Sequence, residues 1–169
     1  YEYPPHARSA EAGYAALLAY REREKELTGE AQAAWHARGV ESSLMFANTW
    51  PDHREVPVIL TTATRQLFEL DQLDRAVEVA ERVLALQPPV DADKQRIALT
   101  VIAHARFDQA QFPEAEAAYL RLRAAIPPND PEQADITEKI AAAVYKQAEE
   151  KQAAGDASGA VDAFLRVTQ

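Results

Sequence analysis

A spacing that recurs three times constrains the fold of this chain more than any other feature. Ala76 and Ala115 each lie 7 residues before an apolar residue and 12 residues before a proline. Ala160 also lies 7 residues before an apolar residue, with no proline after it. The apolar residues are Val83, Leu122 and Val167, and the prolines are Pro88 and Pro127. A small residue at such fixed distances predicts repeated units, which stack because one unit alone leaves its apolar face exposed.

The composition indicates that these units are helical. Alanine, leucine, glutamate, glutamine and arginine dominate the 169 residues, and all five favour helices. Only 5 glycines interrupt the chain, and its β-branched residues are scattered rather than alternating as in strands. An alanine where two antiparallel helices cross lets their axes approach closely, since a larger side chain would hold them apart. The sequence therefore predicts an all-α fold of antiparallel helix pairs.

The repeated segments resemble the tetratricopeptide repeat. In that family a small residue starts the second helix of each pair, an aromatic residue follows four positions later, and a proline closes the unit. Tyr119 and Phe164 match the aromatic position, whereas Ala80 does not. The alanines are 39 and then 45 residues apart (76, 115, 160), so the extra length over the family unit of about 34 residues is expected in longer first helices or in the loop at 125–131. The resemblance implies a short right-handed α-solenoid, and a bundle of ordinary amphipathic helices is the alternative.

The spacing also divides the chain into regions. Residues 1–52 are predicted to hold a degenerate N-terminal helix pair, with helices at 9–27 and 30–49. Residues 53–169 are predicted to hold three tetratricopeptide-like pairs, of which the last is truncated. These pairs cover about 57–90, 96–129 and 141–169.

Local signals place several helix ends. Asp91 and Asp130 follow proline pairs that end helices, and both are suited to cap the next helix. Gln133 stands at the capping-box position after Asp130. A long helix is predicted from 131 to 154, with Gly155 supplying the left-handed residue that favours a helix end.

Charge and cysteine content exclude several functional classes. With 18 basic and 27 acidic residues, the formal charge of −9 repels nucleic-acid backbones and anionic lipid. No apolar run reaches the ~18 residues that span a bilayer. The lack of cysteine excludes disulfides, thiolate catalysis and cysteine-based zinc sites. We therefore expect another protein or a peptide as the partner, with no nucleic acid and no membrane insertion.

Motifs for catalysis or metal binding are not found. None of the four histidines lies three or four residues from another, as a zinc-binding helix requires. Glycine-rich phosphate loops, nucleophile elbows and dinucleotide fingerprints are missing. Dense mixed charge, as at 21–26, is typical of a solvated helix face. The sequence predicts no enzymatic activity, no cofactor and no bound metal.

The resemblance also implies a binding surface, because first helices of tetratricopeptide pairs turn certain positions toward a concave face. Thr61 and Thr100 are 39 residues apart in equivalent positions, and so are Phe68 and Phe107. Aromatic anchors combined with charged residues suit a peptide or helix laid along a groove. In the alternative interpretation, both phenylalanines pack between helices. The predicted protein-binding residues are Thr61, Arg65, Phe68, Thr100, His104, Phe107, Asp108, Tyr145 and Glu149.

These features favour a non-catalytic scaffold or adaptor that binds a peptide or helix on its concave surface. Two alternatives stay open, an accessory domain of a larger enzyme and a structural spacer. The segment 46–52, Phe-Ala-Asn-Thr-Trp-Pro-Asp, resembles loops in tetratricopeptide proteins of the bacterial cell envelope. That resemblance implies a role in envelope assembly and a periplasmic location, with a cytoplasmic location as the alternative.

The two ends of the sequence suggest a fragment of a larger protein. The chain begins at Tyr1 without a methionine, and it stops at Gln169 before the proline expected of its last unit. The final helix carries a broad apolar stripe. We expect at least one further helix in the parent protein, and self-association through this C-terminal helix. The stripe consists of Val161, Phe164, Leu165 and Val167.

Overall fold

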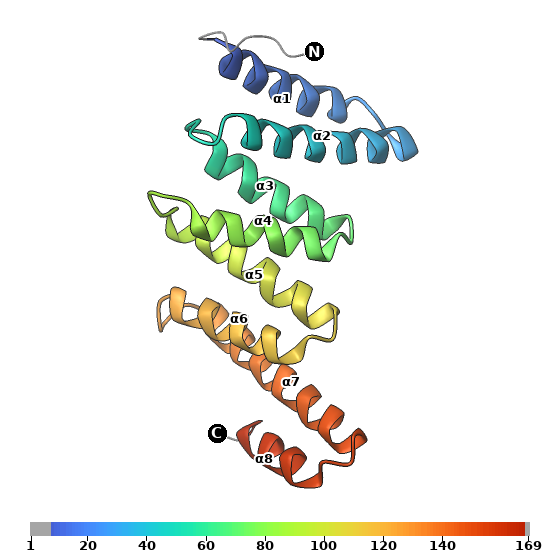
Figure 1. Ribbon diagram of the computed structural model, residues 1–169, viewed down its shortest axis with the longest axis vertical. Helices are drawn as coiled ribbons and strands as arrows, with labels where there is room; N and C mark the ends of the chain where they lie inside the picture. Colours follow the sequence, from blue (N-terminus) through green and yellow to red (C-terminus); the bar gives the residue numbers. More distant parts are fainter. Residues whose placement is uncertain (1–7, 168–169) are drawn as a thin grey trace.

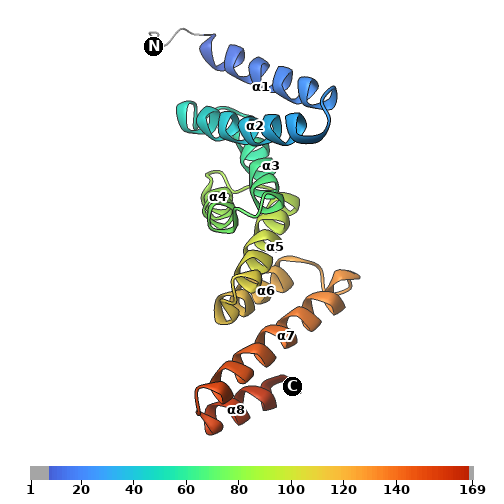
Figure 2. The same cartoon turned by 90° about the vertical axis from the view of Figure 1, so that its right-hand side faces the viewer.

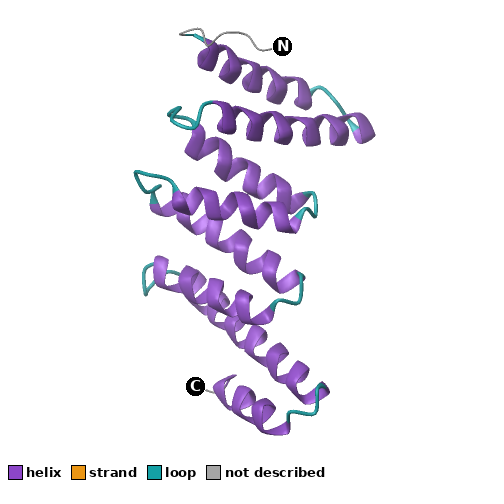
Figure 3. Cartoon of the chain, viewed as in Figure 1, coloured by secondary structure: helices purple, strands orange, loops and turns teal. Residues whose placement is uncertain are grey.

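The computed structural model describes residues 8–167. Within this range the chain forms eight helices and no strand, which confirms the predicted all-α class (Figure 3). The helices are α1 Ser9–Lys25, α2 Gly29–Thr49, α3 Val56–Glu69, α4 Leu73–Ala85, α5 Ala92–Asp108, α6 Phe112–Ala125, α7 Glu132–Ala153 and α8 Ala157–Val167.

The helices form an elongated stack in chain order, with α1 and α8 at opposite ends (Figure 1). Each helix packs against its neighbours in the chain, and α3 also packs against α5. In Figure 2, α3 and α5 lie on one side of the stack and α4 on the other. Sequential packing of this kind is consistent with an α-solenoid, in which each unit contacts only the next.

The repeated alanines lie buried where paired helices meet. Ala76 and Ala115 are 0% exposed, and Ala160 is 3% exposed. Tyr119, at the aromatic position of its unit, is also buried, and Ala80 at the equivalent position of the preceding unit is 0% exposed. The small alanine side chains at 76, 115 and 160 allow close contact between the two helices of each pair. These pairs are α3 with α4, α5 with α6, and α7 with α8.

The growing repeat spacing is explained by the first helix of each pair. From α3 to α5 to α7, that helix lengthens from 14 to 17 to 22 residues. The second helices change less, at 13, 14 and 11 residues. Longer first helices, one of the two expected sources, therefore account for most of the added length.

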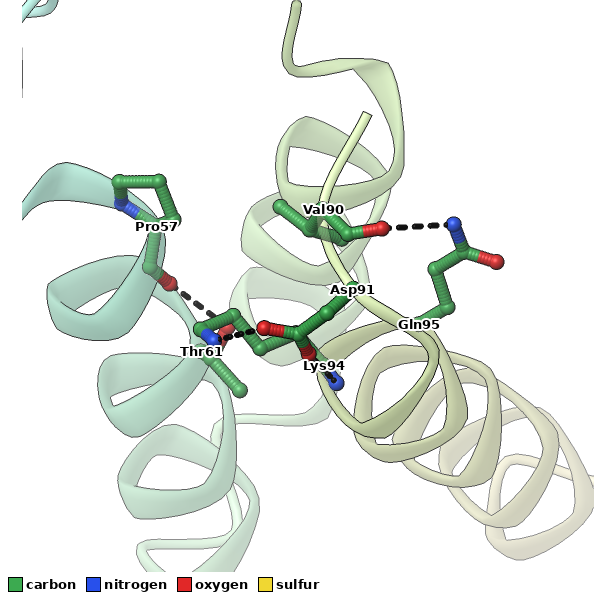
Figure 4. Close-up of polar contacts among 6 residues, drawn as sticks. All are labelled: Pro57, Thr61, Val90, Asp91, Lys94 and Gln95. Atoms are coloured by element: carbon green, nitrogen blue, oxygen red, sulfur yellow. Dashed lines mark hydrogen bonds and ion pairs between the residues drawn. The ribbon is translucent and has the colours of Figure 1, made fainter. Parts of the chain in front are cut away.

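Two predicted helix ends are found, and one cap works differently from the prediction. Asp91 Oδ1 accepts a hydrogen bond from the Lys94 amide at 3.0 Å, so Asp91 caps α5 (Figure 4). Gly155 ends α7 with a φ of 81°. Asp130 accepts from the Glu132 amide at 2.9 Å, but the side-chain amide of Gln133 turns back to α6 instead of completing a capping box. It donates there to the carbonyl oxygens of Arg123, Ile126 and Pro127.

An aromatic cluster joins the two helices of the N-terminal pair. Phe46 is buried in it, with Trp50 at a ring-centroid distance of 5.0 Å and His53 at 5.1 Å. Tyr14 of α1 lies 6.2 Å from Phe46. The aromatic residues of the segment 46–52 thus contribute to the contact between α1 and the end of α2.

Candidate functional site

A groove of about 400 Å³ opens along α5, and we call it the α5 groove. Four helices contribute to it: α3, α5, α6 and α7. In Figure 1, α5 lies between α3 and α7 along the stack. The lining residues are Arg65, Arg96, Ile97, Thr100, Val101, His104, Tyr119, Leu122, Glu132, Asp135, Ile136 and Lys139.

The floor of the α5 groove is apolar. Ile97 and Val101 come from successive turns of α5, because residues four apart share a helix face. Leu122 of α6 and Ile136 of α7 complete the floor. Both side chains are buried, with 3% of Leu122 and 5% of Ile136 exposed. Such a floor favours apolar side chains of an occupant, which leave water on binding.

Charged side chains surround this floor. Arg96 pairs with Glu132 across α5 and α7 at 3.6 Å. Arg65 on α3 and Lys139 on α7 are exposed, and neither has an ion-pair partner among the residues that the structure describes. Asp135 is the remaining charged residue of the lining. The groove therefore has a small cationic excess, although the whole chain carries a charge of −9.

His104 forms part of the groove wall beside two aromatic rings. Its ring centroid lies 5.7 Å from that of Tyr119 and 6.3 Å from that of Phe68. Burial, and then the positive charge of Lys139, lower the pKa of His104, while Asp108 opposes this effect. Burial, helped by Asp108, raises the pKa of Tyr119 to about 12. At neutral pH this wall therefore presents a neutral imidazole and a neutral phenol.

Three of the predicted binding residues come together in the α5 groove: Arg65, Thr100 and His104. Thr61 does not join them, because it is buried and its hydroxyl donates to the Pro57 carbonyl oxygen at 2.7 Å (Figure 4). Phe68 is half-buried against His104. The structure thus brings Arg65 of α3 together with Thr100 and His104 of α5.

The other predicted residues lie outside the groove lining. Phe107 is half-buried, with its ring 5.3 Å from that of Phe112, so it packs within the α5–α6 pair. Asp108 is exposed at the end of α5. Tyr145 stacks edge-on against Phe164 of α8 at 5.3 Å. Glu149 pairs with Lys146 of its own helix at 2.8 Å.

Sequence reasoning missed the part of α7 that completes the groove. Glu132, Asp135, Ile136 and Lys139 lie three or four residues apart, which places them on one face of the helix. The predicted third unit begins at about residue 141. The predicted binding surface therefore leaves out this first half of α7. The three- and four-residue spacing was the signal that could have identified it.

Metal-binding groups and membrane-spanning helices are absent from the part of the chain that the structure describes. Between residues 8 and 167, no three histidine, aspartate or glutamate side chains are grouped closely enough to hold a metal ion. In the same range no helix has the length and apolar character needed to cross a bilayer. Every buried side-chain nitrogen or oxygen of these residues has a hydrogen-bond partner.

Comparisons with known proteins do not assign the chain to a family. No protein-family model matches it, and no curated protein matches it. The resemblance to the tetratricopeptide repeat therefore rests on the alanine, aromatic and proline spacings of the sequence.

Proposed function

We propose that this protein is a non-catalytic interaction scaffold that holds a segment of another protein in the α5 groove. The observation that carries this proposal is the composition of the groove, which combines an apolar floor with two exposed cations, Arg65 and Lys139, that lack ion-pair partners in the described chain. Sites that bind protein segments combine apolar anchoring pockets with a polar rim.

The proposal extends to the repeat architecture and its setting. We infer a right-handed tetratricopeptide-like α-solenoid, supported by the buried alanines at 76, 115 and 160 and by the sequential packing of the helices. We also propose a place in the bacterial cell envelope, supported by the segment 46–52. A lipoprotein or secretory leader in the coding sequence upstream of Tyr1 would support this location, and a coding sequence without one would contradict it.

A pull-down with charge-matched variants tests the binding proposal. The variant Arg65→Glu/Lys139→Glu reverses both exposed cations of the groove. Its control, Arg38→Glu/Lys151→Glu, reverses two exposed cations outside the groove and produces the same net charge. Proteins captured from the source organism by the unmodified chain should be lost from the groove variant and retained by the control.

The result is interpretable only when both variants stay folded. Their helical circular dichroism and melting temperatures should match those of the unmodified chain, because all four side chains are exposed. Capture of the same proteins by the groove variant and the unmodified chain would show that the α5 groove is not the binding site.

A further inference from the structure

The walls of the α5 groove limit the backbone conformation of its occupant. The groove is lined by helices, whose backbone N–H and C=O groups are used within the helix except at the ends, and the described residues contain no strand edge. The groove thus offers side chains but no ladder of main-chain donors and acceptors. An extended peptide would leave its own backbone groups without partners on the buried side, whereas a helix satisfies these groups internally.

The floor determines which face of such a helix would enter. Ile97 and Val101 from α5 lie beside Leu122 and Ile136, so the apolar surface extends across three helices. A helix with apolar side chains three and four residues apart presents one continuous stripe to a surface of this kind.

The rim determines the charge of the occupant. Arg65 and Lys139 lie on the helices to either side of α5, and Arg96 already pairs with Glu132. Asp135 is the remaining carboxylate of the lining, so one positive charge is left in excess. His104 contributes no positive charge at neutral pH, because burial and Lys139 lower its pKa. Two exposed cations that flank an apolar floor favour carboxylates on both sides of an apolar stripe.

Resting on the proposed function, we propose that the occupant of the α5 groove is an acidic amphipathic helix. Its apolar stripe lies on Ile97, Val101, Leu122 and Ile136, and its carboxylates pair with Arg65 and Lys139. The whole chain carries a charge of −9, so the net field of the protein does not favour an acidic helix. Binding of an acidic partner therefore depends on the local charge of the groove.

Three synthetic probes test the proposal by fluorescence anisotropy. Each is a fluorescein-labelled helix of roughly 14 residues, about four turns, with leucines three and four residues apart and alanines elsewhere. The acidic probe carries glutamates beside the leucine stripe, and the neutral and basic probes carry glutamine or lysine in their place. The acidic probe should bind about tenfold more tightly than the neutral one, and its affinity should fall as salt is added.

Variants identify the site and the conformation. Arg65→Glu/Lys139→Glu should weaken binding of the acidic probe at least about tenfold, while Arg38→Glu/Lys151→Glu should leave it unchanged. A proline in the middle of the acidic probe should also weaken binding, because proline breaks the helix.

Several outcomes would overturn the acidic-helix proposal. In these outcomes the acidic probe fails to bind, binds no more tightly than the neutral probe, or binds more weakly than the basic probe. In another, it binds the groove variant Arg65→Glu/Lys139→Glu as tightly as the unmodified chain. An acidic probe that tolerates the central proline would exclude a helix as occupant. The pull-down decides the proposed function separately, because natural proteins captured by the unmodified chain and lost from the groove variant support a binding site in the groove even when no synthetic probe binds.

Discussion

At the scale of single residues, close packing in this protein depends on positions that lack a bulky side chain. Gly13 of α1 faces the Trp50 ring, and a Cβ built there would lie 2.6 Å from Trp50 Cζ3 and 3.2 Å from Phe46 Cδ2. Gly39 of α2 has free space instead, with its nearest atom, Tyr20 Cδ1, at 4.0 Å. Both glycines lie inside helices, so their local backbone preference is the same and only their surroundings differ.

We expect Gly39→Ala to raise the free energy of unfolding. Gly13→Ala should not raise it. Alanine in a helix is about 0.5–1 kcal/mol more favourable than glycine. At position 13 this gain is opposed by the displacement of the Trp50 ring, an overpacking cost of typically 1–3 kcal/mol. Urea denaturation of both variants measures the difference. An equal rise in stability for both would show that Trp50 moves aside at no cost.

His104 should make stability depend on pH. The unfolded chain has the ordinary pKa of 6.5 at this residue, and burial lowers the pKa in the folded chain. As the pH falls below 6.5, the unfolded state binds more protons than the folded state, so the free energy of unfolding decreases. Above 6.5 both states are neutral and the effect disappears.

Comparison with His104→Gln isolates this contribution from other titrating groups. Between about pH 7.5 and about pH 5.5, the loss of stability should be smaller in the variant than in the unmodified chain, as measured by denaturation at each pH. Parallel curves for the two proteins would show that His104 is freely protonated in the folded state. Because His104 is half-buried, its replacement should also lower stability at all pH values, unlike changes at exposed Arg65.

At the scale of elements, each helix pair is held by a buried alanine on its second helix and by side chains that satisfy exposed helix ends. The buried face of α6 consists of Phe112, Ala115, Ala118, Tyr119 and Leu122, a set with spacings of three and four residues. Gln133 joins the next pair to this one, since its side chain donates to the carbonyl groups at the end of α6. Caps and crossings are thus shared between consecutive elements.

Ala115→Leu should destabilise the protein by roughly 1–3 kcal/mol, because the added side chain forces α5 and α6 apart. Ala117→Leu is the matched control: it changes the same residue type on the same helix at an exposed position. Its effect should stay within about 0.5 kcal/mol. The measurement is the midpoint of chemical denaturation. An equal midpoint for the two variants would contradict a close helix crossing at Ala115.

At the scale of the whole molecule, the stack is bound together by one core that runs from α1 to α7 and by ion pairs between successive second helices. Arg75 of α4 pairs with Glu41 of α2 at 2.7 Å and lowers the pKa of that carboxyl by hydrogen bonding. Glu81 of α4 and Arg121 of α6 form the next pair, at 3.4 Å. Such exposed pairs each contribute about 0–1 kcal/mol, so the apolar core dominates stability.

Hydrogen exchange should be slowest in the middle of the stack and fastest at its ends. Leu17 is the buried residue of α1, and α8 buries Ala160 and Ala163, whereas α3 to α6 carry most of the core. In a stack where units contact only their neighbours, an end unit opens without breaking the others. Exchange measured by mass spectrometry should therefore protect α3–α6 most. Uniform protection from α1 to α8 would indicate that the stack opens as a single unit.

The exposed apolar surface predicted for the C-terminal helix is present. Val161 and Leu165 of α8 are 57% and 56% exposed, while Phe164 packs against Tyr145. Self-association through this surface remains a prediction, and measurement of mass in solution as a function of concentration tests it.

The sequence by itself determined the helical class, most helix ends and the buried alanines. These properties depend on local spacing, on turn residues such as Gly155 and on caps such as Asp91, which act within a few residues along the chain. The repeat alignment also placed Arg65 and His104 on one predicted surface, and both line the α5 groove, because α3 and α5 end at the same distance before the repeated alanine.

Only the tertiary structure decided which residues of α7 face the groove. The five extra residues of α7 relative to α5 lie at its N-terminal end, because both helices end 7 residues before the repeated alanine, so the first turns of α7 have no aligned counterpart in α5. Packing of α7 against α6 and α8 turns Lys139 to the groove and leaves Tyr145 beside Phe164. Likewise, Thr61 and Thr100 occupy equivalent positions in the sequence, yet Thr61 is buried and Thr100 lines the groove. Burial depends on neighbours from other helices, which spacing along one helix does not encode.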